Sequence, residues 1–199
     1  MSRHPNFAPV RHLGVDRYPP GAEATEWRPG DFLLTHRQAL LSRFIRVCQR
    51  RMLSGEDKEF AFWSHAALVV STEGELIEAV HRGVQRVSAS EYRDVEYRVV
   101  HVDADDHDRA EAVAFAEWAA ASHQRFGHLT MVSILFTVAT GSRLSFELDG
   151  TEICSGLVAR AEERTGAIFD RDPTHVMPAD LARYYDVRPP ARPMELSLP

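Results

Sequence analysis

The chain has 199 residues, of which 44% are hydrophobic and 26% are charged, and its formal net charge is −6. This length and balance are typical of one globular domain with a substantial core. The acidic excess argues against broad electrostatic binding to nucleic acid, and we expect no nucleic-acid partner.

The two ends of the chain differ in composition from its middle. Proline and glycine interrupt residues 1–28, which predicts an extended N-terminal arm, and residues 188–199 hold four prolines, which predicts a C-terminal tail. Residues 29–187 are the expected folded domain. No segment resembles a secretory signal, and the longest apolar run, residues 129–139, is shorter than the roughly 20 residues of a membrane span. We therefore expect a cytoplasmic protein without a membrane span.

The first elements predicted are a strand and a helix. Residues 32–35 form a short apolar run after a Gly-Asp turn, which indicates a strand. In residues 38–53 the apolar side chains recur at helical spacing with arginines on the other face, which predicts an amphipathic helix. Cys48 lies in that apolar stripe, and we expect it to be a buried structural thiol.

A strand-rich region follows. Residues 62–70 are almost continuously apolar, which predicts a strand buried on both faces. Residues 71–74 predict a turn, and residues 75–80 predict the partner strand of a hairpin. Residues 84–87 and 97–102 predict a third and a fourth strand.

Helices are predicted in the second half of the chain. An alanine-rich helix runs from residue 106 or 108 to about residue 124 and ends before Gly127. Residues 129–139 predict a buried helix, and residues 152–164 predict a last helix that stops at Gly166. Cys154 therefore lies in the first turn of a helix.

That position gives Cys154 a chemical interpretation. The unpaired backbone N–H groups and the positive end of the helix dipole favour a thiolate over a thiol. The same N–H groups can stabilise a developing oxyanion, and the small Ser155 and Gly156 leave room for a substrate. The alternative is that Cys154 is a small core residue, which is the commoner role for a cysteine early in a helix.

Two polar residues in apolar strands complete a candidate triad. His65 begins an otherwise apolar strand, and Glu78 interrupts the apolar residues of the next one. Pairing about the turn at residues 71–74 brings them near each other, so that the carboxylate can orient the imidazole as the base for Cys154. Taken singly, an interior histidine and a solvent-facing glutamate are the commoner roles.

Four short motifs carry a family resemblance. They are Gly30-Asp31-Phe32-Leu33-Leu34, Trp63-Ser64-His65-Ala66-Ala67-Leu68-Val69, Leu76-Ile77-Glu78-Ala79-Val80 with Gly83-Val84, and Glu152-Ile153-Cys154-Ser155-Gly156-Leu157-Val158. In this order they resemble the circularly permuted papain-like members of the NlpC/P60 superfamily, the YiiX-like hydrolases. The resemblance implies an α+β permuted papain-like fold, with an antiparallel sheet or small barrel packed against helices.

The resemblance also implies roles for individual residues: Cys154 as nucleophile, His65 as base and Glu78 as the third polar residue. Ser64, Ser155 and His128 are candidate substrate contacts. His128 follows Gly127 where many relatives have a Tyr-Asp pair, so the substrate is the least defined feature.

The expected reaction is hydrolysis of an amide or peptide bond through an acyl-enzyme, with no metal or organic cofactor. The chain has two cysteines without Cys-x-x-Cys spacing, and its acidic residues 103–108 are better explained as the solvated start of a helix than as metal ligands.

Two alternatives remain open. One is lipid acyl transfer or thioester hydrolysis, as in the similar lecithin:retinol acyltransferase branch, with an acyl pocket lined by Leu129, Met131, Ile134, Leu135 and Phe136. The other is a non-enzymatic papain-like domain that binds a ligand or partner. The sequence identifies neither the substrate, whether a small peptide, another amide or an acyl lipid, nor the oligomeric state.

Overall fold

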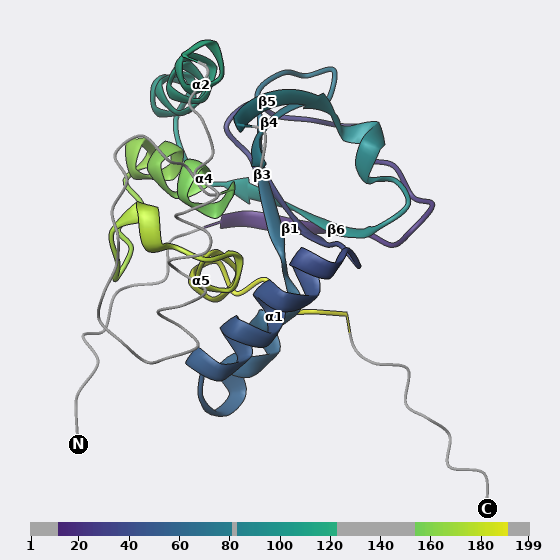
Figure 1. Cartoon of the computed structure of the whole chain (residues 1–199). Helices are drawn as coiled ribbons and strands as arrows, with labels where there is room; N and C mark the ends of the chain where they lie inside the picture. The colour runs from purple at the N-terminus through teal and green to yellow at the C-terminus, as the bar shows by residue number, and fades with distance from the viewer. Residues whose placement is uncertain (1–11, 81–82, 123–153, 191–199) are drawn as a thin grey trace, which may run out of the picture.

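The computed structural model describes residues 12–80, 83–122 and 154–190. They form an α+β fold in which a six-stranded antiparallel sheet packs against helices (Figure 1). The strand order is β1-β6-β2-β3-β4-β5. The strands are β1 (His12–Tyr18), β2 (Phe32–His36), β3 (His65–Val69), β4 (Glu75–Val80), β5 (Gly83–Ser88) and β6 (Glu96–Val102).

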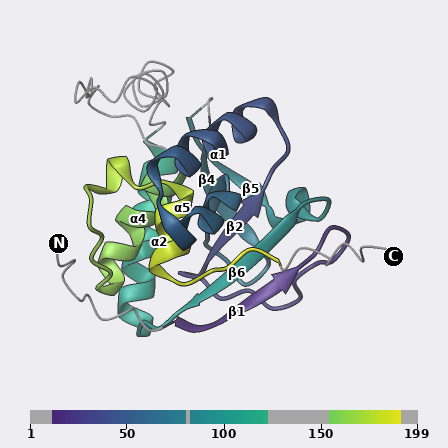
Figure 2. The same cartoon turned by 90° about the horizontal axis from the view of Figure 1, so that it is seen from below.

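The helices lie together against the sheet, as two perpendicular views show (Figures 1 and 2). The α-helices are α1 (Leu40–Met52), α2 (Asp106–Ala121), α4 (Cys154–Glu162) and α5 (Pro178–Tyr184). The short 3₁₀ helices are η1 (Gly55–Phe62), η2 (Ala89–Tyr92), η3 (Glu163–Thr165) and η4 (Pro173–His175). Helices α2 and α4 both pack on the sheet region formed by β3 and β4.

Each strand divides its side chains between two cores because successive residues point to opposite faces of a sheet. On β2, Phe32 and Leu34 join the larger core with the helices, whereas Leu33 lies in a smaller core on the other face. The smaller core is covered by the strongly curved sheet itself and by η2, which contributes Tyr92 (Figure 1). All five residues of β3 are buried, which confirms the prediction of a strand buried on both faces.

The turn between β3 and β4 fixes the hairpin on which Glu78 lies. Gly74 adopts φ +79°, and a Cβ atom built there would lie 2.8 Å from Nε1 of Trp27. Glycine meets both constraints because it has no Cβ atom and tolerates positive φ. Leu68 then pairs with Ile77 and Val69 with Leu76, which confirms the predicted hairpin.

The N-terminal region differs from the prediction. We expected an extended arm up to residue 28, but β1 pairs in antiparallel fashion with β6 and forms an edge of the sheet. Because β1 is half exposed and does not alternate cleanly between buried and exposed residues, it lacks the periodicity that identifies a strand. Its position is set by backbone pairing with β6.

Helix α1 differs from the prediction in its orientation. Its bounds agree with the expected helix, but the apolar stripe is largely exposed, and Ser42, Cys48 and Gln49 are the buried residues. Gln49 lies on the buried side of the helix, where its side chain donates to the carbonyl of Trp63 at 2.8 Å and accepts from the N–H of Ala179 at 2.9 Å. In this orientation both polar atoms of the buried amide are hydrogen-bonded, as a buried polar group requires.

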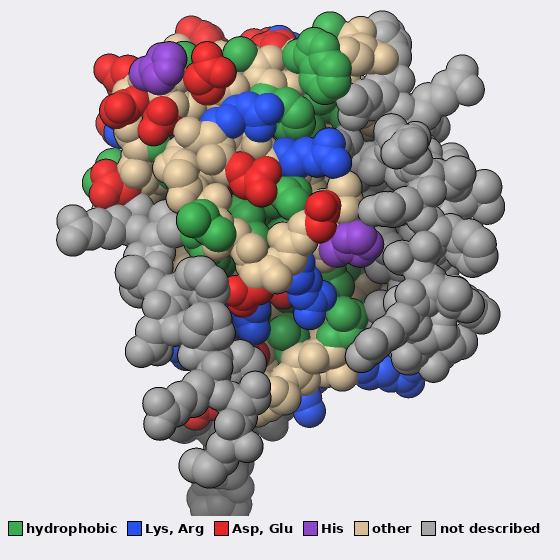
Figure 3. All heavy atoms as spheres, turned by 90° about the vertical axis from the view of Figure 1, so that its left-hand side faces the viewer, with side chains coloured by type: hydrophobic (Ala, Val, Ile, Leu, Met, Phe, Trp, Pro, Cys, Tyr) green, Lys and Arg blue, Asp and Glu red, His purple; other side chains and the backbone are tan. Residues whose placement is uncertain are grey.

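Helix α2 begins in an acidic surface. Asp105 caps it by accepting from the N–H of Asp108 at 2.9 Å, and acidic side chains gather near this end of the molecule (Figure 3). Among the described residues, no group of three or more His, Cys, Asp and Glu side chains is placed to hold a metal ion. Asp105, Asp106 and Asp108 lie at the N-terminal end of α2, where negative charge is favourable.

The last described elements, α4 and α5, differ in how well they were predicted. Helix α4 ends at Glu162 and is followed directly by η3, which stops at the expected Gly166, at φ +86°. Helix α5 was not predicted; it starts with Pro178 and is almost completely buried. The predicted Gly127 terminus and the helix at residues 129–139 lie outside the described residues. No helix in the described part of the chain has the length and apolarity needed to cross a membrane.

Candidate active site

The site forms where β3 and α4 begin. His65 is the first residue of β3, and Cys154 is the first residue of α4, which packs along that strand. The charge of each side chain shifts the pKa of the other, and the backbone N–H groups of Ala66 and Ser155 favour the thiolate form of Cys154. Cys154 is partly exposed, so solvent can reach the residue.

Glu78 lies on the other side of the His65 ring. Nε2 of His65 is 2.5 Å from Oε2 of Glu78, and both residues are buried. The β3–β4 register, extended by one pair, sets Glu78 opposite Ala67, two residues from His65 on the same face of the sheet. Such diagonal neighbours are within reach of long side chains, so the hairpin itself brings the pair together.

Glu78 is held by further hydrogen bonds that sequence reasoning missed. The Tyr92 hydroxyl donates to Oε2, and the Gln85 amide donates to Oε1 at 2.8 Å. Burial alone would raise the pKa of Glu78, but the hydrogen bond and positive charge of His65, together with Tyr92 and Gln85, lower it to about 2. Glu78 is therefore an ionised carboxylate, which can only accept hydrogen bonds.

The ionised carboxylate fixes the protonation of the imidazole. Because Glu78 only accepts, Nε2 of His65 carries a proton and donates it to Oε2. Nδ1 is then the ring nitrogen left for Cys154. Burial favours a neutral ring, but the charge and hydrogen bond of Cys154, together with those of Glu78, raise the pKa of His65 to about 9.

The same coupling acts on the thiol. Burial disfavours the thiolate, but the charge and hydrogen bond of His65, supported by the N–H groups of Ala66 and Ser155, lower the pKa of Cys154. Opposite shifts in the two partners favour a thiolate beside an imidazolium. Such a pair is a preformed nucleophile, and its imidazolium can donate a proton later in a reaction.

Arg37 adds positive charge behind the carboxylate. Its guanidinium lies 3.9 Å from Oε2 of Glu78 and 4.7 Å from the centre of the Tyr92 ring. The Tyr92 ring in turn lies nearly parallel to that of His65, with 6.2 Å between their centres. Tyr92 therefore supports the imidazole through its ring as well as the carboxylate through its hydroxyl.

Part of this arrangement can be read from the sequence. Gln85 faces Glu78 directly in the β4–β5 ladder, so extending the hairpin reasoning to the next strand finds it. Tyr92 belongs to the short helix η2, where no strand register applies, and no sequence signal places it at Glu78.

The proposed substrate contacts are placed differently from the triad. Ser155 is fully buried and its hydroxyl donates to the carbonyl of Val176 at 2.6 Å. Ser64 is also buried, where its hydroxyl accepts from the N–H of Arg37 at 3.1 Å. Both hydroxyls thus hold the chain around the site, and of these two serines only Ser155 favours the thiolate, through its backbone N–H. His128 lies outside the described residues.

Cys48 provides an internal contrast to Cys154. It is buried in α1, as predicted, and burial raises the pKa of its thiol even though the charge of Arg51 opposes this. The two cysteines of the chain therefore differ in both access and ionisation, which makes Cys48 a built-in control for the reactivity of Cys154.

Comparisons with known proteins do not assign the chain to a family. No family model matches it, and no curated protein is significantly similar to it.

Proposed function

We propose that this protein is a cysteine-nucleophile hydrolase that cleaves an amide or peptide bond through an acyl-enzyme, with Cys154, His65 and Glu78 as its triad. The observation that carries the proposal is the position of His65, which hydrogen-bonds Glu78 through Nε2 and whose pKa is raised by the charge of Cys154. The permuted papain-like fold implied by the sequence motifs is part of the same proposal. It accords with the α+β architecture and with a cysteine helix that follows the histidine strand.

The reaction follows from the charges of the three residues. The Cys154 thiolate attacks the carbonyl carbon, the carbonyl π bond opens, and the oxygen becomes an oxyanion. The N–H of Ser155 at the start of α4 is placed to stabilise that charge. The His65 imidazolium then gives its proton to the departing nitrogen as the carbon–nitrogen bond breaks, which leaves a thioester and a neutral imidazole.

Hydrolysis of the thioester restores the site. His65, now neutral, takes a proton from a water molecule, which adds to the thioester carbonyl and releases the carboxylic acid. The sulfur leaves as a thiolate, and the protonated imidazole pairs with it again. Glu78 stays ionised throughout and stabilises the imidazolium both before acylation and after His65 has deprotonated the water.

Acyl transfer to an acceptor other than water uses the same first half-reaction. The residues expected to line an acyl pocket, from Leu129 to Phe136, lie outside the described residues, so no described contact bears on this alternative. The nature of the acceptor does not change the roles of the three residues.

The test is to detect the acyl-enzyme directly. The protein is mixed with activated acyl esters and a panel of peptide amides, and intact mass spectrometry followed by peptide mapping locates any adduct. We expect an acyl group on Cys154, no adduct on Cys48, and loss of turnover in Cys154→Ala. An adduct that forms equally on both cysteines, or turnover that survives Cys154→Ala, would overturn the proposal. The His65→Ala variant should slow acylation, whereas Cys48→Ala should leave it unchanged.

A further inference from the structure

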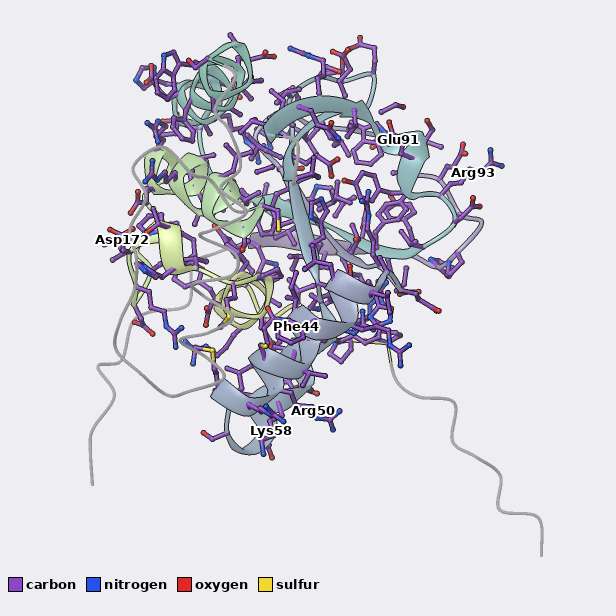
Figure 4. The ribbon with its side chains drawn as sticks, in the orientation of Figure 1. Phe44, Arg50, Lys58, Glu91, Arg93 and Asp172 are labelled. Atoms are coloured by element: carbon purple, nitrogen blue, oxygen red, sulfur yellow. The ribbon has the colours of Figure 1, made fainter. Side chains whose placement is uncertain are left out.

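Helix α1 exposes an apolar stripe that is not used by the core. Leu40, Phe44 and Val47 follow one another at helical spacing and are 83%, 42% and 51% exposed. Leu41 and Met52, on the adjacent side, are 46% and 41% exposed. Figure 4 labels Phe44 and Arg50 on this helix. Together these five apolar residues, here called the α1 stripe, form a surface that water solvates poorly.

The outward orientation of the α1 stripe is fixed by polar contacts on the opposite side of the helix. The buried Gln49 amide is bound to Trp63 and Ala179, as described above. One turn earlier, the Arg46 guanidinium donates to the carbonyl of Arg37 at 2.5 Å. Rotating α1 to bury the stripe would break these bonds and leave a buried amide unsatisfied. The stripe is therefore a stable feature of the folded chain.

The charge on α1 indicates what the stripe contacts. The helix carries four arginines and no acidic residue, although the whole chain has a net charge of −6. Arg43, Arg50 and Arg51 are exposed, and none of them forms an ion pair with a described carboxylate.

The nearest acidic element does not neutralise this helix. In η1, which follows α1 and packs against it, Asp57 pairs with Arg183 and Glu59 with Arg188, while Glu56 is exposed and forms no ion pair with a described arginine of α1. The positive charge of α1 therefore remains available to an anionic partner.

An exposed apolar stripe with arginines beside it is the pattern of a helix that lies in a membrane interface. The apolar side chains enter the boundary between headgroups and acyl chains, while arginine stems extend along the helix and place their guanidinium groups at the phosphates. We propose that the α1 stripe and its arginines bind the surface of an anionic lipid bilayer. This inference does not depend on the proposed hydrolase activity.

Vesicle co-sedimentation tests the proposal on the full chain. We expect the protein to bind phosphatidylcholine vesicles that contain phosphatidylserine, and to bind pure phosphatidylcholine vesicles at least 10-fold more weakly. Raising the salt concentration should weaken binding because it screens the arginines. The inactive Cys154→Ala variant should bind as the wild type does, so a failure of the hydrolase proposal leaves this test intact.

Two variants separate the apolar and charged contributions. The Phe44→Ser/Val47→Ser protein and the Arg43→Gln/Arg50→Gln/Arg51→Gln protein should each bind anionic vesicles at least 10-fold more weakly. Ile168→Ser is the matched control because Ile168 is 66% exposed but lies outside α1. Thermal unfolding midpoints close to wild type would show that the exposed substitutions leave the fold intact.

Three outcomes would overturn the proposal. The wild-type protein does not bind anionic vesicles, or both α1 variants retain binding in full. The third outcome is that α1 serves as a contact between two copies of this chain: a dimer in light scattering that Phe44→Ser/Val47→Ser dissociates, without vesicle binding at any protein concentration.

Discussion

Glu78 and Gln85 face each other across the β4–β5 ladder, and the Gln85 amide donates to Oε1 of Glu78 at 2.8 Å. This bond leaves Oε2 to accept from His65 and from Tyr92. All three donors approach a carboxylate that is buried and ionised. The arrangement therefore requires an acceptor with two oxygens and a negative charge at position 78.

The Glu78→Gln variant should lose most of the reactivity of Cys154. An amide cannot accept from all three donors: if its NH₂ group faces His65, Nε2 loses its proton and Nδ1 carries the proton toward the thiol, the wrong tautomer for a base. The charge that holds the imidazolium is lost as well. We expect the alkylation rate of Cys154 at pH 6.5 to fall by about 10-fold or more.

Glu75→Gln is the control for that substitution. Glu75 lies on the same strand but is exposed and paired with Arg86, so its loss should leave the alkylation rate unchanged. Equal rates in Glu78→Gln and wild type, at unchanged thermal stability, would exclude Glu78 from the triad.

The Tyr92→Phe variant should weaken the site while leaving the fold intact. It removes the hydroxyl that donates to Glu78 but keeps the ring that lies parallel to His65. Hydrogen bonds to charged groups contribute about 1.5–3 kcal/mol, so a loss of roughly 10-fold in acylation rate is expected. Tyr97→Phe is a suitable comparison, because Tyr97 is buried on the same face and accepts from Ala24 instead. A similar loss in both variants would point to general loosening of the smaller core.

The reactivity of Cys154 should persist at a pH where ordinary thiols are protonated. His65 lowers the pKa of Cys154, whereas burial raises that of Cys48. Iodoacetamide labelling, followed at each cysteine by peptide mass spectrometry, should be fast at Cys154 at pH 7 and absent at Cys48. In His65→Ala the labelling midpoint of Cys154 should move up toward the ordinary thiol value of about 8.5. Labelling of wild-type Cys154 that rises only near pH 8.5 would contradict the ion pair.

The upper pH limit of turnover should differ from that of labelling. The leaving nitrogen needs a proton from His65, whose pKa is raised to about 9, so turnover should fall as the pH rises through that value. Alkylation needs only the thiolate and should not fall there. A basic limb that lies instead near pH 6.5 would show that His65 is not coupled to Cys154 and Glu78.

The sequence predicts those parts of the site that local pairing determines. A continuous apolar run, a short turn and a second apolar run predict the β3–β4 hairpin, and the hairpin brings His65 to Glu78. Cys154 lies beside His65 because α4 packs along β3, and no spacing in the sequence predicts that packing. The pairing of the two residues was instead predicted from the family resemblance of the ordered motifs. The hydrogen bond from Tyr92 to Glu78 likewise depends on how η2 packs and not on a strand register.

The rotation of α1 shows why periodicity alone is insufficient. Its apolar stripe predicts a buried face, yet the fold buries Gln49, whose partners Trp63 and Ala179 come from distant parts of the chain. Helix α5, which supplies Ala179, is buried nearly all round and so has no amphipathic pattern. Pro178 at its first position was the available signal for a helix start.

Glu162 should make the stability of the protein depend on pH. It is fully buried at the end of α4, where its Oε2 accepts from Tyr185 and Thr165, each at 3.2 Å. Oε1 has no hydrogen-bond partner among the described residues. Burial outweighs the opposing hydrogen bonds and raises the pKa of Glu162 to about 8.

Because the pKa of Glu162 is raised in the folded chain, this residue makes the protein less stable as the pH rises. Between the ordinary glutamate pKa and about 8 the folded chain holds a proton that the unfolded chain releases, so the free energy of unfolding falls as the pH rises. The contribution is complete below the unfolded pKa, near 4.5, and is lost by the time the pH exceeds 8. The full effect is on the order of 5 kcal/mol.

Glu162→Gln isolates this contribution, because glutamine keeps an oxygen for Tyr185 and Thr165 but does not ionise. The free energy of unfolding, measured in urea, should fall more between pH 5 and pH 8.5 in the wild type than in Glu162→Gln. The difference between the two proteins removes the contributions of other groups, including that of His65, whose raised pKa acts in an overlapping range. Identical changes in both proteins would mean that Glu162 is ionised in the folded chain at neutral pH, and the missing partner of Oε1 would then have to be a cation or a donor.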